Sequence, residues 1–298
     1  MMQGDVLKTA LDHALTLGYR HIDTAAAYEN EEEIGEVIQA HINSGKIIRE
    51  DLFITTKIPS ICLAKQDALE SAHQSLRRLK VKYVDLLLIH HPWGQVNRGN
   101  GDFNPWMNDG SGRREIVNTD YLETWDALES LVHDGFAKHI GVSNFTQAQI
   151  ERVLSVAKVP LSNVQLECHT YYQQHKLKAF CDANNIIVSA YAPMGAAGRK
   201  YKYESEAVVL SRDSLVVDIA AKYNKTPCQI LLNFLLCRKF VVLPKSSSPD
   251  HLLENMEALN FELSAEDLNR LYSLDRGLRL FPFPYIHHHP EFHEDEEF

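Results

Sequence analysis

The sequence predicts an α/β fold in which a parallel sheet is arranged as a (β/α)8 TIM-type barrel. Short apolar runs alternate with segments of helical periodicity through the 298 residues, and this alternation is typical of right-handed βαβ units. Nearly every apolar run ends in a polar side chain, as expected where one end of a barrel carries the active site. No linker or change of composition divides the chain, so we expect residues 1–298 to form a single domain.

Seven short runs with strand-like composition are the expected strands. They occupy residues 20–25, 52–57, 84–90, 139–144, 163–168, 186–193 and 240–244. Segments with apolar residues at helical spacing lie between them. These are residues 5–17, 31–42, 67–79, 121–132, 147–155, 176–184, 214–223 and 227–238. Gly18 is the expected stop of the first helix, Thr226 and Ser248 each precede a first-turn proline, and Ser264 with Asp267 resembles a capping box.

Polar side chains stand at the carboxyl ends of the expected strands. These residues are Asp23, Lys57, His90, Asn144, Gln165 with Glu167, Tyr191 and Lys245. Because parallel strands of a barrel end on the same face, we expect these side chains to line one polar site. Two long connections, residues 92–118 and 195–212, leave the same face, and we expect them to complete the site.

Composition excludes several classes of protein. The formal net charge of −10 disfavours a nucleic-acid-binding protein, which would carry a basic stripe. No apolar stretch approaches the ~20 residues that a membrane-spanning helix needs, and the first residues do not resemble a signal peptide. Five scattered cysteines without CxxC spacing fit a reduced, cytoplasmic protein. We expect the acidic segment 291–297 and the histidines at 287–289 to be solvated.

Asp23, Tyr28, Lys57 and His90 are residue types from which a proton-transfer site can be built. A phenol with a pKa near ~10 exchanges protons slowly at neutral pH. An ammonium such as Lys57 close by favours the phenolate and is expected to lower the pKa of Tyr28. Asp23 would keep Lys57 charged, and His90 would position a substrate oxygen. We therefore expect this set to protonate a carbonyl oxygen.

A metal-dependent barrel hydrolase is the competing enzyme class. Alternation along a strand places His21 and Asp23 on the same side, with His90 and His91 as further candidate ligands. No complete ligand set falls at a recognised spacing, and this interpretation leaves the Ser143-Asn144 and Lys245-Ser246 pairs without a role. We therefore expect no bound metal.

Several motifs occur together in one order along the chain. Residues 18–35 (GYRHIDTAAAYENEEEIG), 140–145 (IGVSNF), 164–169 (VQLECH), 190–195 (AYAPMG) and 243–246 (LPKS) resemble the motifs of the aldo-keto reductase family. The resemblance extends from about residue 5 to residue 298. It implies a (β/α)8 barrel that reduces small-molecule aldehydes or ketones to alcohols with NADPH. We expect the protein to be a monomer.

The resemblance also implies roles for individual residues. Asp23, Tyr28, Lys57 and His90 match the catalytic tetrad, with Tyr28 as the general acid. Other residues match the groups that hold the cofactor. They are Ser143, Asn144 and Gln165 at the nicotinamide carboxamide, Tyr191 stacked on the nicotinamide ring, Lys245, Ser246 and Ser248 at the 2′-phosphate, and Glu254 and Asn255 near adenine.

Two positions depart from the family pattern. His251 replaces an arginine that would bind the 2′-phosphate, so NADH becomes possible beside NADPH. His91 stands next to His90 where the family often carries a pocket aromatic. The substrate-pocket candidates are therefore His91, Trp93 and Trp106, and the aromatic residues Phe281, Phe283 and Tyr285 are weaker ones.

The start of the sequence is the third departure. Members of the family begin with a hairpin and a first barrel strand, whereas residues 1–4 are too few to form them. We therefore expect an incomplete barrel of seven strands with the first strand missing. The non-enzymatic alternative is a catalytically impaired cofactor-binding protein or a truncated relative, although the complete tetrad favours an enzyme.

Overall fold

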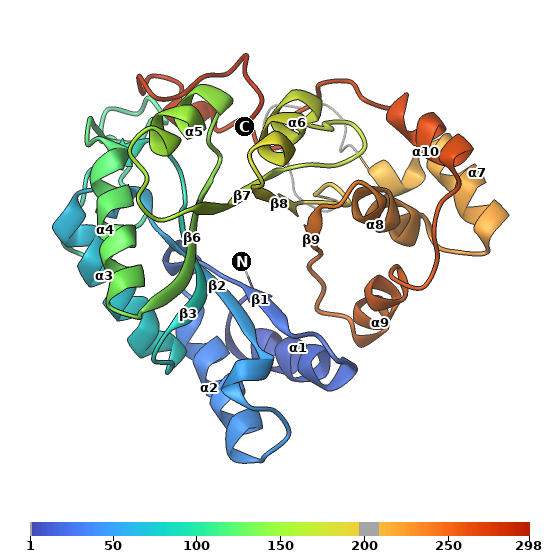
Figure 1. The fold of residues 1–298 in the computed structure, drawn as a ribbon, viewed down its shortest axis with the longest axis horizontal. Coiled ribbons are helices and arrows are strands. Elements are labelled where there is room, and N and C mark those ends of the chain that lie inside the picture. The colour runs from blue at the N-terminus through green and yellow to red at the C-terminus, as the bar shows by residue number, and fades with distance from the viewer. Residues whose placement is uncertain (1, 197–208) are drawn as a thin grey trace. The chain divides into compact units, whose positions relative to one another are not determined.

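The computed structural model describes residues 2–196 and 209–298, so most of the connection at 195–212 lies outside the described residues. In this part of the chain the main sheet has seven strands in the order β1-β2-β3-β6-β7-β8-β9 (Figure 1). The β1–β2, β2–β3, β3–β6 and β8–β9 pairs are parallel. The strands are β1 (His21–Asp23), β2 (Phe53–Ile58), β3 (Val84–Ile89), β6 (Ala137–Ser143), β7 (Leu161–Glu167), β8 (Ile187–Tyr191) and β9 (Val241–Leu243). The seven predicted strands are thus confirmed, each with slightly different ends.

The chain forms two compact units. The first unit comprises Met1–Val164 and Phe283–Phe298, and the second comprises Gln165–Pro282. The helices of the first unit are α1 (Gly4–Leu17), α2 (Glu31–Asn43), α3 (Lys65–Leu79), α4 (Tyr121–His133) and α5 (Gln147–Leu154). Those described in the second unit are α6 (His175–Ala183), α7 (Ser214–Tyr223), α8 (Pro227–Cys237), α9 (Pro249–Glu257) and α10 (Ala265–Tyr272). The described helices are too short or too polar to cross a membrane.

Local signals explain where several helices begin and end. Gly18 adopts φ 103° and ends α1 in the left-handed conformation that glycine favours. Thr226 starts α8 with a reciprocal capping box to Gln229, and Ser248 caps α9. Ser264 caps α10 as predicted, because its hydroxyl accepts from the backbone N–H of Asp267 at 3.2 Å. These helix ends could be predicted because each signal lies within a few residues of the end it marks.

A short helix between β1 and α2 positions Tyr28. This 3-10 helix spans Ala26–Tyr28. The backbone N–H groups of Tyr28 and Glu29 donate to the carbonyl groups of Ala25 and Ala26 at 2.9 and 3.1 Å. Glu29 then adopts φ 53°, which turns the chain into α2. Tyr28 is therefore held one turn beyond the end of β1.

The C-terminal segment of the first unit fits the expectation of a solvated tail only in part: His287 and residues 294–296 are exposed, but other residues of the segment are buried. Phe292 and Phe298 pack with Trp93 and Ile286 in a buried cluster. His289 is only 3% exposed, because its ring lies against a small hairpin, β4 (Gly94–Gln95) and β5 (Ile116–Val117), that was not predicted. The acidic side chains at 294–296 stay exposed, while the apolar side chains of the same segment are buried.

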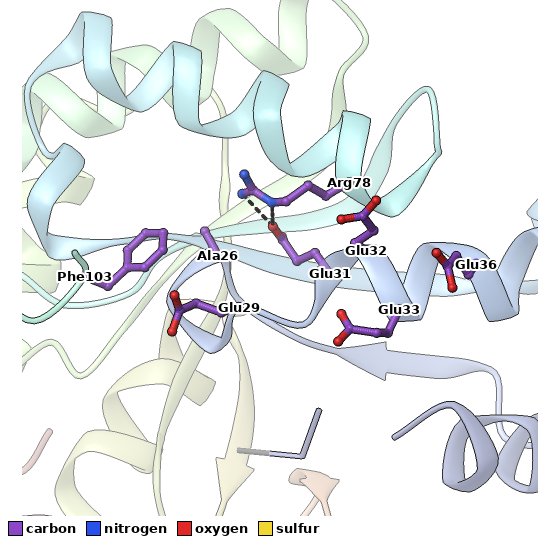
Figure 2. Close-up of a pocket in the computed structure, with 8 residues that line it drawn as sticks. All are labelled: Ala26, Glu29, Glu31, Glu32, Glu33, Glu36, Arg78 and Phe103. Atoms are coloured by element: carbon purple, nitrogen blue, oxygen red, sulfur yellow. Dashed lines mark hydrogen bonds and ion pairs between the residues drawn. The ribbon is translucent and has the colours of Figure 1, made fainter. Parts of the chain in front are cut away.

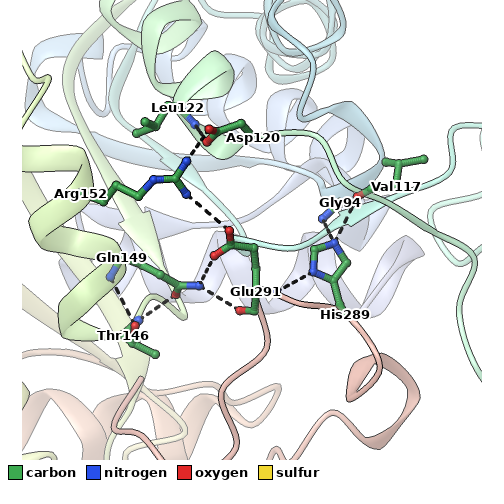
Figure 3. A network of polar contacts seen from close by, with 9 residues as sticks. All are labelled: Gly94, Val117, Asp120, Leu122, Thr146, Gln149, Arg152, His289 and Glu291. Atoms are coloured by element: carbon green, nitrogen blue, oxygen red, sulfur yellow. Dashed lines mark hydrogen bonds and ion pairs between the residues drawn. The ribbon is translucent and has the colours of Figure 1, made fainter.

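Polar contacts also hold this segment within the first unit (Figure 3). The Nε2 atom of His289 lies 3.1 Å from the carbonyl oxygen of Val117, and its Nδ1 atom accepts from the N–H of Glu291 at 3.0 Å. The side chain of Gln149 donates to Glu291, and Arg152 lies 3.4 Å from the same carboxylate. Residues 289–291 are therefore fixed to α5 and to the hairpin.

Candidate active site

The four proton-transfer candidates come together at the carboxyl ends of neighbouring strands in the first unit. Asp23 is the last residue of β1, Lys57 is the last but one of β2, and His90 follows β3 directly. Register pairs Asp23 with Thr55 and Lys57 with Leu88, so consecutive strands bring these side chains side by side. Tyr28 reaches the same place from its 3-10 helix, because its ring contacts both Lys57 and His90.

Lys57 is a wholly buried ammonium with two fixed acceptors. Its Nζ atom lies 2.6 Å from Oδ1 of Asp23 and donates to the carbonyl oxygen of Thr24 at 2.8 Å. Burial favours the neutral amine, but the carboxylate of Asp23 and the hydroxyl of Tyr28 outweigh it, and the pKa of Lys57 is raised. Lys57 is therefore a permanent cation at neutral pH.

Tyr28 lies beside this cation. The Nζ atom of Lys57 is 5.1 Å from the centre of the Tyr28 ring. Burial raises the pKa of Tyr28 above its ordinary value, and the opposing effect of Lys57 does not reverse the shift. The expected lowering of this pKa is thus wrong in its net direction, because removal of water from the phenol is the larger effect. At neutral pH the hydroxyl keeps its proton.

His90 completes the group as a neutral imidazole. Its ring packs edge-on against Tyr28 with centroids 5.5 Å apart. Its backbone N–H donates to the carbonyl of Ile58, and its carbonyl accepts from the side chain of Asn144, at 3.0 and 2.9 Å. Burial, His91 and Lys57 together hold the pKa of His90 well below its usual value. A neutral ring can still donate one hydrogen bond.

His91 stacks on His90 at 4.4 Å with the rings almost parallel, and its Nδ1 lies 3.3 Å from the hydroxyl of Ser60. Burial is the main reason that its pKa falls to about 3. Trp93 stacks behind His91 at 4.7 Å and is 1% exposed, so it supports His91 from within the core. Trp106 is exposed and packs on the guanidinium of Arg114 at 3.8 Å. The three pocket candidates therefore occupy different environments.

Ser143 and Asn144 stand at the end of β6 in the first unit. Both are buried, and Asn144 adopts φ 62°, a left-handed conformation that asparagine tolerates better than most residues. The side chain of Asn144 donates to the hydroxyl of Ser143 at 3.1 Å and to the carbonyl of His90 at 2.9 Å. This pair is therefore a fixed polar group next to His90.

In the second unit, Gln165 and Tyr191 lie on β7 and β8. Gln165 is buried, whereas Tyr191 is half-buried at the last position of its strand. The ring of Phe281 meets Tyr191 at 5.4 Å and at 90°. From the sequence, Phe281 was only a weaker pocket candidate. In the structure its ring packs against one side of the Tyr191 ring.

The remaining cofactor candidates surround the start of α9. Lys245 is exposed two residues beyond β9, and the hydroxyl of Ser246 accepts from the N–H of Ser248 at 3.0 Å. Ser248 caps α9, and exposed His251 lies in its first turn. A helix N-terminus near a lysine is a suitable environment for an anion.

Glu254 and Asn255 follow on the same helix. The hydroxyl of Thr226 donates to the carboxylate of Glu254, and Gln229 donates to its backbone carbonyl at 3.0 Å. Asn255 is buried. Glu254 also lines a depression of about 490 Å³ between the starts of α8 and α9. Glu254 thus has a structural partner of its own beside this depression.

An acidic depression lies at the start of α2 in the first unit (Figure 2). It measures about 450 Å³ and is lined by Ala26, Glu29, Glu31, Glu32, Glu33, Glu36, Arg78 and Phe103. Glu31 is buried there and pairs with Arg78 at 2.7 Å. The described residues contain no cluster of three or more side chains arranged to hold a metal ion.

Known proteins resemble this chain over most of its length. Residues 2–276 match the model of the aldo/keto reductase family. Aldo-keto reductase family 1 member A1 of Gallus gallus is 41% identical over 274 residues, which cover 92% of this chain and 82% of that protein. The human protein of the same name is 38% identical over 274 residues, which cover 92% of this chain and 83% of the human one.

A solved structure agrees with the sequence relatives. The aldose reductase from Schistosoma japonicum superposes with a TM-score of 0.91 at 33% sequence identity, covering 100% of this chain and 93% of that one. The predicted fold class, a (β/α)8-type barrel, is thereby confirmed.

Proposed function

Because this chain belongs to the aldo/keto reductase family, we propose that it is an oxidoreductase that reduces aldehydes or ketones to alcohols with a nicotinamide dinucleotide. The observation that carries the proposal is the arrangement of Tyr28, whose proton is retained at neutral pH, beside the buried ammonium of Lys57. A proton donor next to a fixed cation suits the protonation of a carbonyl oxygen.

A nicotinamide dinucleotide held by the residues assigned below would supply the hydride. The hydroxyl of Tyr28 gives its proton to the carbonyl oxygen, and the phenolate that remains lies beside Lys57, which stabilises it. Asp23 keeps Lys57 charged and oriented through the 2.6 Å ion pair. Neutral His90 donates a hydrogen bond to the substrate oxygen, and solvent then reprotonates Tyr28.

We assign the cofactor-binding residues by their chemistry. Ser143 and Asn144 offer hydroxyl and amide groups suited to a carboxamide, and Gln165 offers a further amide group. The half-buried ring of Tyr191 offers an aromatic face. Around the start of α9, Lys245, Ser246, Ser248 and His251 form the group for a 2′-phosphate, with Glu254 and Asn255 for adenine. The donor set fits NADPH; His251 makes NADH an alternative.

The proposed substrate is a small-molecule aldehyde or ketone, with His91 as the nearest pocket residue because it stacks on His90. Trp93 stacks on His91 and supports it. The exposed Trp106 is a further proposed pocket residue. The five cysteines are free thiols, which supports a reducing, cytoplasmic location. We further propose that the protein acts as a monomer.

The test is a titration with NADPH followed by a turnover assay with a test aldehyde. We expect saturable dinucleotide binding and loss of nicotinamide absorbance in proportion to the alcohol formed. The same assay after treatment with a chelator should give unchanged turnover. Binding without turnover would contradict the proposal and favour a cofactor-binding protein, whereas no binding at all would favour an inactive relative.

A further inference from the structure

Glu167, the last residue of β7, is a buried carboxylate that the proposed reaction does not use. It is 1% exposed and lies among hydrogen-bond donors. Its Oε1 atom is 2.9 Å from Nε2 of His169 and accepts from the N–H of Leu280 at 2.6 Å. Its Oε2 atom accepts from the N–H of Phe281 at 3.0 Å. Two consecutive backbone amides, 113 and 114 residues further along the chain, therefore end on one carboxylate.

The same stretch of chain is bound to the turn that follows β7. The backbone N–H groups of Arg276 and Leu278 donate to the carbonyl of Tyr171 at 3.1 and 3.0 Å. The side chain of Arg279 donates to the hydroxyl of Tyr172 at 2.7 Å. We call residues 276–281 the docked segment. Glu167 supplies its last two contacts, immediately before the chain leaves the second unit.

The docked segment ends against Tyr191. The ring of Phe281 packs edge-on to the ring of Tyr191 with centroids 5.4 Å apart and planes at 90°. The strands themselves are also tied at this point, because the N–H of Cys168, which follows Glu167, donates to the carbonyl of Tyr191 at 3.3 Å. The edge-on contact restricts how the plane of the Tyr191 ring can turn. Aromatic pairs prefer this edge-to-face geometry.

We propose that Glu167 is a positioning residue for dinucleotide binding. Its carboxylate holds the amides of Leu280 and Phe281, which seats the Phe281 ring and fixes the plane of Tyr191 for the nicotinamide. The inference rests on the proposed function, because it takes Tyr191 as the stacking residue. Glu167 thus affects the binding of the cofactor, although it lies outside the catalytic tetrad.

The chemistry of a carboxylate is needed for this role. Hydrogen bonds to an ionised acceptor are stronger than neutral ones, and a carboxylate can accept from all three donors at once. A glutamine would present an amide nitrogen, itself a donor, to one of them. Glu167→Gln should therefore release part of the docked segment while preserving the size of the side chain.

The experiment measures the Kd of NADPH for four variants by titration of the cofactor fluorescence. We expect Phe281→Leu, which removes the ring but keeps the backbone contacts, to raise the Kd about ten-fold, and Glu167→Gln, which only loosens the ring, to raise it about three-fold. The double variant should match Phe281→Leu alone, because without the ring Glu167 has nothing to position. Glu262→Gln, the same change at an exposed position of the second unit, is the matched control and should bind like the unchanged protein.

Hydrogen exchange gives a readout that does not depend on the cofactor. The amides of the docked segment should lose protection in Glu167→Gln and keep it in Phe281→Leu. A folded Glu167→Gln variant with an unchanged Kd, or losses that add fully to about thirty-fold in the double variant, would overturn the proposal. An unchanged Kd for Phe281→Leu would do so even if Glu167→Gln failed to fold. If the unchanged protein bound no dinucleotide, the proposed function itself would fall, and this inference with it.

Discussion

The Nζ atom of Lys57 lies 2.6 Å from Oδ1 of Asp23, and the lysine side chain is wholly buried while the carboxylate is 15% exposed. Little water reaches this ion pair, so hydration cannot compensate either charged group if its partner is removed. Lys57 also contacts the Tyr28 ring, so one cation serves the carboxylate and the proton donor together. Stability and proposed catalysis therefore depend on the same atom.

Replacing Lys57 by methionine should harm both properties. The change keeps the apolar stem but leaves Asp23 without its cation, and the free energy of unfolding should fall by about 3 kcal/mol. Turnover should fall at least about a hundred-fold, because the phenolate of Tyr28 loses its stabilising charge. Urea unfolding and steady-state kinetics check the two effects. A Lys57→Met protein with normal turnover would show that the ammonium has no part in proton transfer.

Replacing Tyr28 by phenylalanine separates chemistry from binding. The variant keeps the ring that contacts Lys57 and His90 but has no proton to give, so carbonyl reduction should be abolished while the Kd of the dinucleotide stays within about two-fold. Tyr83→Phe is the matched control, since the Tyr83 ring packs against Arg49 and Lys138 away from the proposed site. Undiminished turnover in Tyr28→Phe would refute the assignment of the proton donor.

Local patterns in the sequence were enough to predict the strands, most helices and the grouping of the tetrad. Strand-end polarity places Asp23, Lys57 and His90 together because parallel neighbours end on one face. The β4–β5 hairpin was missed because each strand has only two residues and shows no periodicity. Gly94 is its one local signal: a Cβ atom there would lie 2.5 Å from the carbonyl oxygen of Val117.

Features that depend on distant packing were beyond sequence patterns. The direction of the Tyr28 pKa shift follows from how much water the fold removes, which residue spacing does not record. The charge of the C-terminal segment suggested a solvated tail, yet Phe298 packs on Trp93, 205 residues earlier in the numbering (298 minus 93). The contact from Glu167 to Leu280 likewise joins residues 113 apart. In each case the partner is set by the tertiary fold.

Acid should weaken the fold through the stacked histidines. The pKa values of His90 and His91 are lowered in the folded protein, to about 3 for His91, against 6.5 for an ordinary histidine. Between these values the unfolded chain binds more protons than the folded one, so the free energy of unfolding should fall as the pH falls below about 6.5. Above that pH these two residues should cause no change.

The matched test of this pH dependence is His91→Phe, which keeps a ring beside His90 but cannot be protonated. Its free energy of unfolding, measured in urea between pH 4 and pH 7.5, should change less steeply with pH than that of the unchanged protein. His133→Phe alters an exposed histidine on the last turn of α4 and should leave the slope unchanged. Equal slopes for His91→Phe and the unchanged protein would show that His91 is not buried in its neutral form.

In the proposed cofactor site, the residue at position 251 would set how strongly the start of α9 favours a 2′-phosphate. Arginine is always charged and binds phosphate through two parallel hydrogen bonds, whereas a neutral histidine does neither. His251→Arg should therefore lower the Kd of NADPH about ten-fold and that of NADH by no more than about two-fold. His175→Arg makes the same change at the first residue of α6 and should affect both dinucleotides equally. If His251→Arg shifted both affinities by the same factor, residue 251 would not lie near the 2′-phosphate, and the charge would act only at long range.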